Sequence, residues 1–154
     1  PRRMSGLTRV ASRMLPAGYA YRFDPDRIFS TTAFPSGGGG MAGTADAALQ
    51  LLETLRCGTF LDSALRMAAA QPRCNKIRSP RGPGWNHAWA GAVLLDPLRA
   101  RSTLSPGSLS WGGIYGHSWW IDPARERTLV AFTNTAVEGM NGTFAADMAR
   151  AVAA

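Results

Sequence analysis

The sequence has 154 residues, and 45% of them are hydrophobic, so it is long enough for one domain with a substantial core. Its formal net charge of +7 comes almost wholly from scattered arginines, since Lys76 is the only lysine, and this scatter argues against a nucleic-acid partner. No apolar run approaches the roughly 20 residues of a membrane span, so no membrane partner is expected. Cys57 and Cys74 are too few for a disulfide scaffold, and we expect two free thiols.

The first part of the chain is expected to be poor in regular structure. Residues 1–33 carry turn signals and form an irregular segment with at most one short helix near Ser5–Met14. The sequence does not begin with Met and shows no signal-peptide pattern, which suggests a fragment or a processed product. The glycine-rich stretch Ser36–Gly40 is followed by Met41, where a phosphate-binding loop would carry lysine. We therefore expect a close-packed backbone crossing there.

Two helices are predicted within residues 34–84. Thr44 is a good N-cap, apolar residues then recur at helical spacing, and Gly58 is placed to end this helix in a left-handed conformation. A second helix fits Asp62–Ala70, with Leu65 and Met67 as buried side chains. The rest of this part, up to residue 84, reads as loop because it holds three prolines.

After residue 84 the apolar period changes from about 3.6 to 2, which indicates strands. Short turn sequences separate the last strands and favour hairpins. The predicted elements are strands at Ala88–Leu95, Ser108–Gly113, His117–Ile121 and Thr128–Asn134, followed by a helix at Thr143–Ala153. Residues 1–154 thus form one α+β domain in which 85–154 make an antiparallel meander plus a C-terminal helix that lies on the sheet.

The tripeptide Trp111-Gly112-Gly113 at a strand end is the first candidate for chemistry. A glycine pair there lets a ligand approach the backbone, and a free N–H can stabilise an oxyanion. The plainer alternative is a buried tryptophan beside a bulge. His117 and Ser118 are neighbours in a strand and point to opposite faces, so they do not suit a nucleophile–base pair.

Other chemistry is weakly indicated. The cysteines and histidines lack zinc-ligand spacing, so no metal and no cofactor are predicted. Aspartates at turns have local structural roles. The five tryptophans can bind an apolar substrate group or form core, and of Trp119 and Trp120 at least one should be buried.

In chain order these segments resemble the C-terminal portion of a serine hydrolase of the β-lactamase and penicillin-binding superfamily. They are most similar to the family VIII carboxylesterases, which are related to class C β-lactamases. The segments concerned are the glycine-rich entry to a helix at 34–46, Trp111-Gly112-Gly113, the strand and turn at 116–123, and Thr133-Asn134-Thr135 before a terminal helix. Trp111-Gly112-Gly113 matches the esterase form of the family's Lys-Thr-Gly motif.

The resemblance implies a partial β-lactamase/transpeptidase-like fold. The family's nucleophile and base lie in a Ser-x-x-Lys motif, and a tyrosine assists them; none of these motifs stands in this sequence, where position 73 is Arg73 and Tyr19 and Tyr21 match no tyrosine motif. An N-terminal portion carrying Ser, Lys and Tyr is therefore the expected partner. Without it the sheet should have an exposed edge and an uncovered apolar face, and the chain alone should be inactive.

The resemblance also implies roles for residues near the tripeptide. The backbone N–H of Ile114, with Gly113, would stabilise an oxyanion in an acyl-enzyme reaction on carboxylic esters or β-lactams. Trp111, Gly112, Tyr115 and His117 would bind substrate, and Trp111 in place of lysine favours esters. The alternative hypothesis is a non-catalytic binding module that uses an aromatic-rich sheet.

Overall fold

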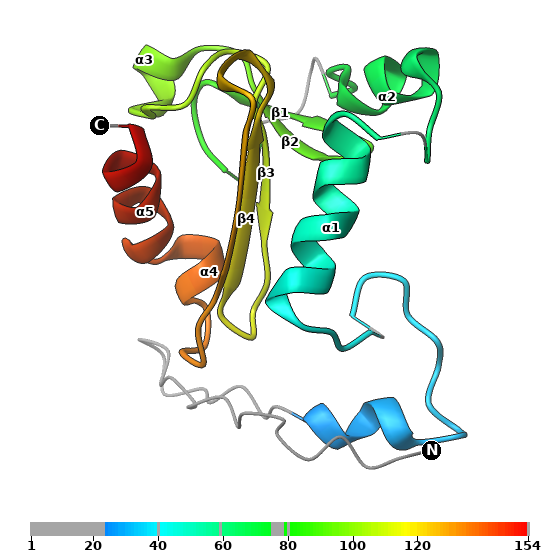
Figure 1. The fold of residues 1–154 in the computed structure, drawn as a ribbon. Helices are drawn as coiled ribbons and strands as arrows, with labels where there is room; N and C mark the ends of the chain where they lie inside the picture. Colours follow the sequence, from blue (N-terminus) through cyan, green and yellow to red (C-terminus); the bar gives the residue numbers. More distant parts are fainter. Residues whose placement is uncertain (1–23, 40, 59, 75–78, 80, 154) are drawn as a thin grey trace.

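The computed structural model describes residues 24–39, 41–58, 60–74, 79 and 81–153. The expected helix near Ser5–Met14 and the residues Tyr19, Tyr21 and Lys76 lie outside this part. A central sheet with helices on both faces forms the body of the fold (Figure 1). This confirms the predicted α+β class. Among the described helices, none has the length and apolar character that a bilayer crossing demands.

The sheet has five antiparallel strands that lie side by side in chain order, β1 to β5. Each strand pairs with the next, so the meander predicted for 85–154 is confirmed. Both β1 and β5 have only one neighbouring strand, which leaves two open edges among the described residues. The strands are β1 Trp85–Ala88, β2 Gly91–Leu94, β3 Leu109–Gly112, β4 His117–Asp122 and β5 Arg127–Phe132.

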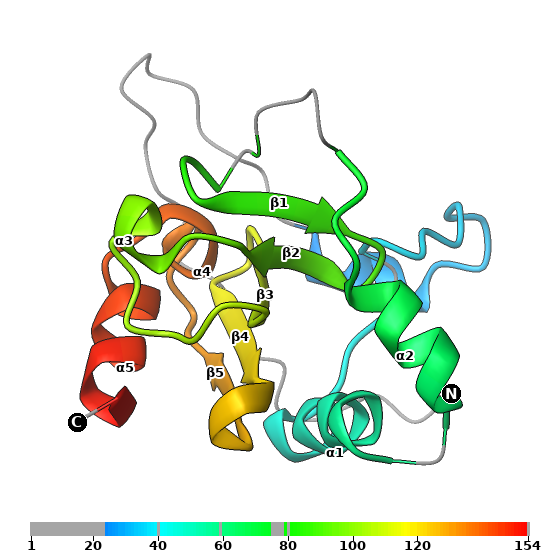
Figure 2. The ribbon, with the colours of Figure 1, turned by 90° about the horizontal axis from the view of Figure 1, so that it is seen from above.

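Helices lie on both faces of the sheet. The helices α1 (Ala45–Arg56) and α2 (Ser63–Ala70) lie on one side, and α4 (Glu138–Asn141) and α5 (Phe144–Ala153) lie on the other (Figures 1 and 2). Short helical turns complete the chain: η1 Pro25–Phe29, α3 Pro97–Ala100 and η2 Pro123–Arg125.

Strand alternation divides the core between the two faces. On the α1 face, Leu52 packs with Val93, Leu109 and Ile121. On the α5 face, Trp120 and Leu94 pack with Leu104 and Ala149. Trp120 is 4% exposed, and Trp119 is partly buried on the opposite face, so the expectation of one buried tryptophan is confirmed.

The starts of the helices follow the predicted capping chemistry. The hydroxyl oxygen of Thr44 accepts the Ala47 N–H, and an oxygen of Asp62 accepts the Leu65 N–H. The end of α1 differs from the prediction, because Gly58 does not have a positive φ. A Cβ at Gly58 would lie 2.5 Å from the Thr54 Cα, so close packing rather than a left-handed turn requires glycine there.

The prediction of one strand over Ala88–Leu95 is wrong. The chain reverses there between β1 and β2, with Ala88 paired to Gly91. Trp89 therefore lies in a turn and is 73% exposed, with the Arg73 guanidinium 4.4 Å from its ring centroid. Continuous apolar sequence concealed this turn, whose one turn-forming residue is Gly91 at φ +144.

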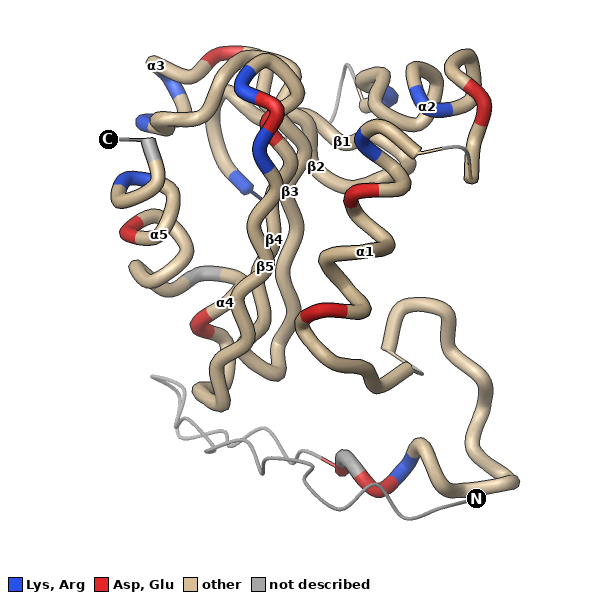
Figure 3. The backbone as a smooth tube through the Cα atoms, in the orientation of Figure 1, with Lys and Arg blue, Asp and Glu red and all other residues tan. Residues whose placement is uncertain are grey.

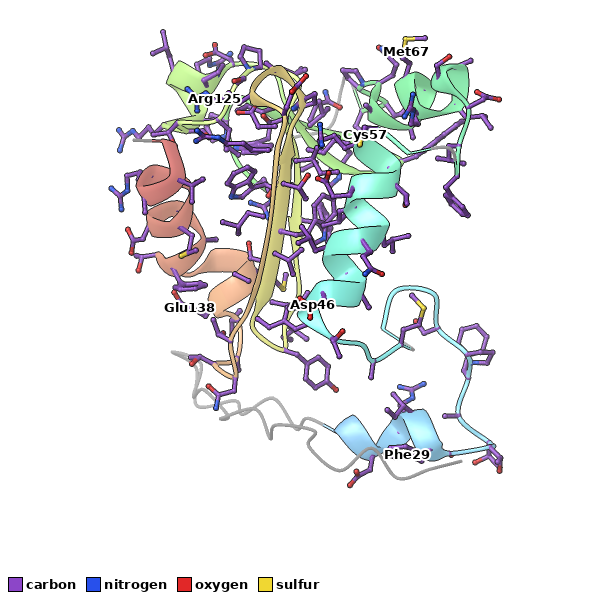
Figure 4. The ribbon with its side chains drawn as sticks, viewed as in Figure 1. Phe29, Asp46, Cys57, Met67, Arg125 and Glu138 are labelled. Carbon is purple, nitrogen blue, oxygen red and sulfur yellow. The ribbon has the colours of Figure 1, made fainter. Side chains whose placement is uncertain are left out.

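Two expectations for the earlier part of the chain are also wrong. Leu65 and Met67 are 51% and 63% exposed, because no described element covers their side of α2; Figure 4 shows Met67 pointing outward. The glycine-rich stretch is no close-packed crossing either, since Cβ atoms at Gly37 and Gly39 would meet nothing within 4 Å. Both cysteines are free, as predicted.

Candidate active site

The candidate site surrounds the turn that joins β3 to β4, at the lower end of the sheet in Figure 1. The turn is closed by two backbone hydrogen bonds: the Gly113 N–H donates to the His117 carbonyl at 2.8 Å, and the Gly116 N–H donates to the Gly113 carbonyl at 3.0 Å. Gly116 has φ +103, a conformation that side chains disfavour. The predicted hairpin is therefore confirmed, and its backbone is held at both ends.

Ile114 lies in this turn with one backbone group bonded and the other free. Its carbonyl accepts the Val137 N–H at 2.8 Å, which ties the turn to the start of α4. Its N–H has no acceptor among the described residues. Val137 has φ 68, a strained conformation for a β-branched residue. A donor without an acceptor among the described residues thus stands just after β3, on a peptide whose Gly113 carbonyl is held by the Gly116 N–H.

The two glycines of the tripeptide are required by packing. A Cβ on Gly112 would lie 2.1 Å from the carbonyl oxygen of Gly139 in α4. A Cβ on Gly113 would lie 2.0 Å from Cε1 of the His117 imidazole. We expected a ligand to approach the backbone beside these two glycines, but protein atoms fill that space. A ligand can therefore approach this backbone only at the turn, where the Ile114 N–H has no acceptor among the described residues.

His117 begins β4 and covers Gly113 with its ring. The ring meets the Phe132 ring edge-on at 67°, with the centroids 5.9 Å apart. Neither ring nitrogen has a hydrogen-bond partner among the described residues. Burial lowers the pKa of His117 below its usual range, so the imidazole is neutral at neutral pH. At this position the ring acts as an aromatic packing group.

Trp111 lies on the same face as α1, paired across the strands with Trp119. It is 38% exposed, and its ring meets the His87 ring at a centroid distance of 5.3 Å and an interplanar angle of 64°. His87 comes from β1, two strands away, and the sequence analysis did not place it at the site. No sequence signal marks this contact, because it depends on the unpredicted β1–β2 hairpin.

The remaining predicted residues are also placed. Tyr115 is half-buried at the tip of the turn and makes contacts with its surroundings. Ser118 is 2% exposed and pairs with Gly112 on the face opposite His117, so it does not form a nucleophile–base pair. No group of three or more metal-binding side chains gathers within the described part of the chain.

The turn end of the sheet carries no charged side chain of its own. Residues 102–121 contain no Asp, Glu, Lys or Arg, and Figure 3 shows the charges of the strands at the opposite end. Glu138 on α4 and Asp46 at the start of α1 flank the lower sheet from opposite faces (Figure 4). The strand and turn residues beside Trp111 and Ile114 thus carry no formal charge.

Comparison with known proteins shows the family of this chain. The sequence model of the Beta-lactamase family matches residues 1–154. The chain belongs to the β-lactamase family. Within this family it is 45% identical to Esterase EstB of Burkholderia gladioli over 131 residues, which are 83% of this chain and 33% of EstB. It is 26% identical to Protein Rv1367c of Mycobacterium tuberculosis over 114 residues, 64% of this chain and 28% of that protein.

A solved structure has a similar fold. It is EstCE1, described as a hydrolase with promiscuous acyltransferase activity. The TM-score is 0.81 at 40% sequence identity, and the match covers 94% of this chain and 39% of EstCE1. The predicted β-lactamase-like fold is therefore confirmed. The chain spans about a third of the length of the relatives it matches.

Proposed function

We propose that this chain forms one wall of the active site of a serine hydrolase that cleaves carboxylic esters through an acyl-enzyme. The catalytic serine, lysine and tyrosine lie on residues outside this sequence. The family membership and the esterase relatives support the reaction class. The observation that carries the proposal is the Ile114 N–H directly after Trp111-Gly112-Gly113, which has no acceptor among the described residues.

In the proposed reaction the serine oxygen attacks the ester carbonyl carbon, and the base formed by the lysine and the tyrosine takes up the one serine proton. The carbonyl electron pair moves to oxygen, and the resulting oxyanion accepts hydrogen bonds from the Ile114 N–H and the serine N–H. One such donor contributes about 3–4 kcal/mol to transition-state stabilisation. The intermediate expels the alcohol, which takes up the proton, and water then cleaves the acyl-enzyme to release the acid. Gly113 contributes by its carbonyl, which holds the turn through Gly116.

Trp111 and Tyr115 flank the carbonyl position in this proposal, and Gly112 allows α4 to pack on β3. The uncharged turn and the tryptophan in place of lysine favour a neutral ester over a carboxylate-bearing β-lactam. EstCE1 is described as a hydrolase with promiscuous acyltransferase activity, and we expect that an acceptor other than water can also take the acyl group in the second step.

The test joins this chain behind the amino-terminal portion of Esterase EstB, giving what we call the joined enzyme. The joined enzyme should hydrolyse p-nitrophenyl butyrate with a kcat/KM well above that for nitrocefin. Equal or faster turnover of nitrocefin would contradict the ester preference. A folded joined enzyme that cleaves neither substrate, shown by cooperative unfolding in urea, would contradict the proposed function.

The 154-residue chain by itself is expected to hydrolyse neither substrate. A serine-reactive fluorophosphonate should leave it unlabelled, and labelling of Ser118 or any other serine would contradict the proposal. A non-catalytic binding module remains the second candidate function, favoured by the exposed aromatic residues Trp89, Trp111 and Phe132. That candidate requires the chain to bind a ligand without the catalytic serine.

A further inference from the structure

We propose that His117 is a positioning residue for the oxyanion-binding N–H of Ile114, acting through the contact of its ring with Gly113. The inference rests on the proposed function and assigns His117 a different role from lining the substrate pocket. Three sets of contacts carry it.

The first set restrains the peptide between Gly113 and Ile114 through its own carbonyl and that of the next peptide. The Gly113 carbonyl accepts from Gly116, and the Ile114 carbonyl accepts from Val137. These bonds hold two carbonyls, but the Ile114 N–H has no acceptor among the described residues, and neither bond restrains the Cα of Gly113 directly. Rotation of this peptide is therefore restrained only in part by the backbone.

The second set supplies the remaining restraint. The His117 ring stands where a Cβ of Gly113 would be, with Cε1 and Nε2 at 2.0 and 2.2 Å from that point. The ring thus rests directly on the Gly113 backbone. A glycine at this place has wide conformational freedom, and the imidazole blocks one side toward which the peptide would otherwise move.

The third set holds the ring itself. Phe132 meets it edge-on from the paired position on β5. The His117 backbone is held in turn, because its carbonyl accepts the Gly113 N–H and lies where a Cβ of Gly139 would be, at 1.9 Å. With no hydrogen-bond partner for either nitrogen among the described residues, the shape of the ring accounts for these contacts.

The test compares four variants of the joined enzyme, at His117 (Ala, Phe and Asn) and at Phe132 (Ala), with p-nitrophenyl esters of short and long acyl chains. His117→Ala should lower kcat about 10- to 100-fold for every ester with little change in KM, because a misplaced oxyanion donor weakens transition-state binding alone. His117→Phe should restore most of kcat by restoring a flat ring. Phe132→Ala, which loosens the ring without removing it, should give a smaller loss.

Two kinetic outcomes would overturn the inference. A rise in KM limited to long acyl chains in His117→Ala would make His117 a pocket wall. Activity retained in His117→Asn but lost in His117→Phe would show that the ring acts by polarity. Crystal structures separate this inference from the proposed function: a Gly113–Ile114 peptide displaced in His117→Ala supports the positioning role even in an inactive enzyme, and an unmoved peptide contradicts it.

Discussion

Replacing Gly112 by alanine adds one methyl group, yet it should lower both the stability and the activity of the joined enzyme substantially. The new Cβ would lie 2.1 Å from the Gly139 carbonyl oxygen, which must retreat by about 1.3 Å to reach the 3.4 Å of ordinary contact. The obstacle is backbone, so no side chain can turn aside. Overpacking of this kind costs about 1–3 kcal/mol, and displacing α4 also strains the Val137–Ile114 hydrogen bond, worth about 1 kcal/mol.

We therefore expect Gly112→Ala to lower the free energy of unfolding by about 3 kcal/mol in urea titrations followed by tryptophan fluorescence. The turnover of p-nitrophenyl butyrate should fall about 100-fold, since a shift near 1 Å is enough for such a loss. Gly37→Ala is the matched control, because its Cβ would meet nothing within 4 Å; its unfolding free energy should stay within about 0.5 kcal/mol. A Gly112→Ala enzyme as stable as this control would refute the packing of α4 on β3.

Three further predictions concern other parts of the chain. Asp122 is 1% exposed and accepts the Ser105 N–H at 2.9 Å, so Asp122→Ala should cost about 3 kcal/mol of unfolding free energy; a loss below 1 kcal/mol in urea would contradict this. Trp111→Lys should raise the nitrocefin-to-butyrate ratio of kcat/KM about tenfold, the effect of one charged hydrogen bond, and an unchanged ratio would argue against the charge explanation of ester preference. The Arg56 guanidinium lowers the pKa of Glu53 to about 2. The ion pair therefore stabilises the fold fully above the unfolded pKa of Glu53, and this stabilisation is lost as the pH falls toward 2. Glu53→Gln should lower the free energy of unfolding by about 0.5 kcal/mol at pH 7 after solvent screening and leave it unchanged near pH 2, as paired urea titrations would show.

Local sequence signals located most helices and strands correctly. Thr44 and Asp62 cap helices because their side chains are short acceptors, and this property is visible in any sequence. Period-2 patterns placed β3, β4 and β5 within two residues of their ends. Such signals depend on neighbours along the chain and not on the rest of the fold.

Features that depend on distant contacts were not predictable from the sequence. Leu65 and Met67 lie at positions that an amphipathic helix buries, yet nothing described covers them. The reversal at Trp89 depends on Gly91. A Cβ at Gly91 would lie 3.1 Å from the ring of Trp119, a residue 28 positions later. For the same reason the contact of His87 with Trp111 was missed.

At the candidate site the sequence indicated which residues form the site, but it did not show which contacts require those residue types. Trp111-Gly112-Gly113 pointed to a backbone that a ligand can approach. The structure instead places Gly139 and His117 against those glycines, and neither contact leaves a mark in the tripeptide. The free N–H of Ile114 was predictable from the family resemblance, whereas the hydrogen bond that fixes its carbonyl depends on Val137, 23 residues later.

A structure of the joined enzyme inactivated by a p-nitrophenyl alkylphosphonate tests the central claim most directly. The phosphonyl oxygen mimics the oxyanion of ester hydrolysis, and we predict that it lies roughly 2.7–3.1 Å from the Ile114 nitrogen. A phosphonyl oxygen that points away from Ile114, with the phosphonate still bound to the serine, would contradict the role of this turn in catalysis.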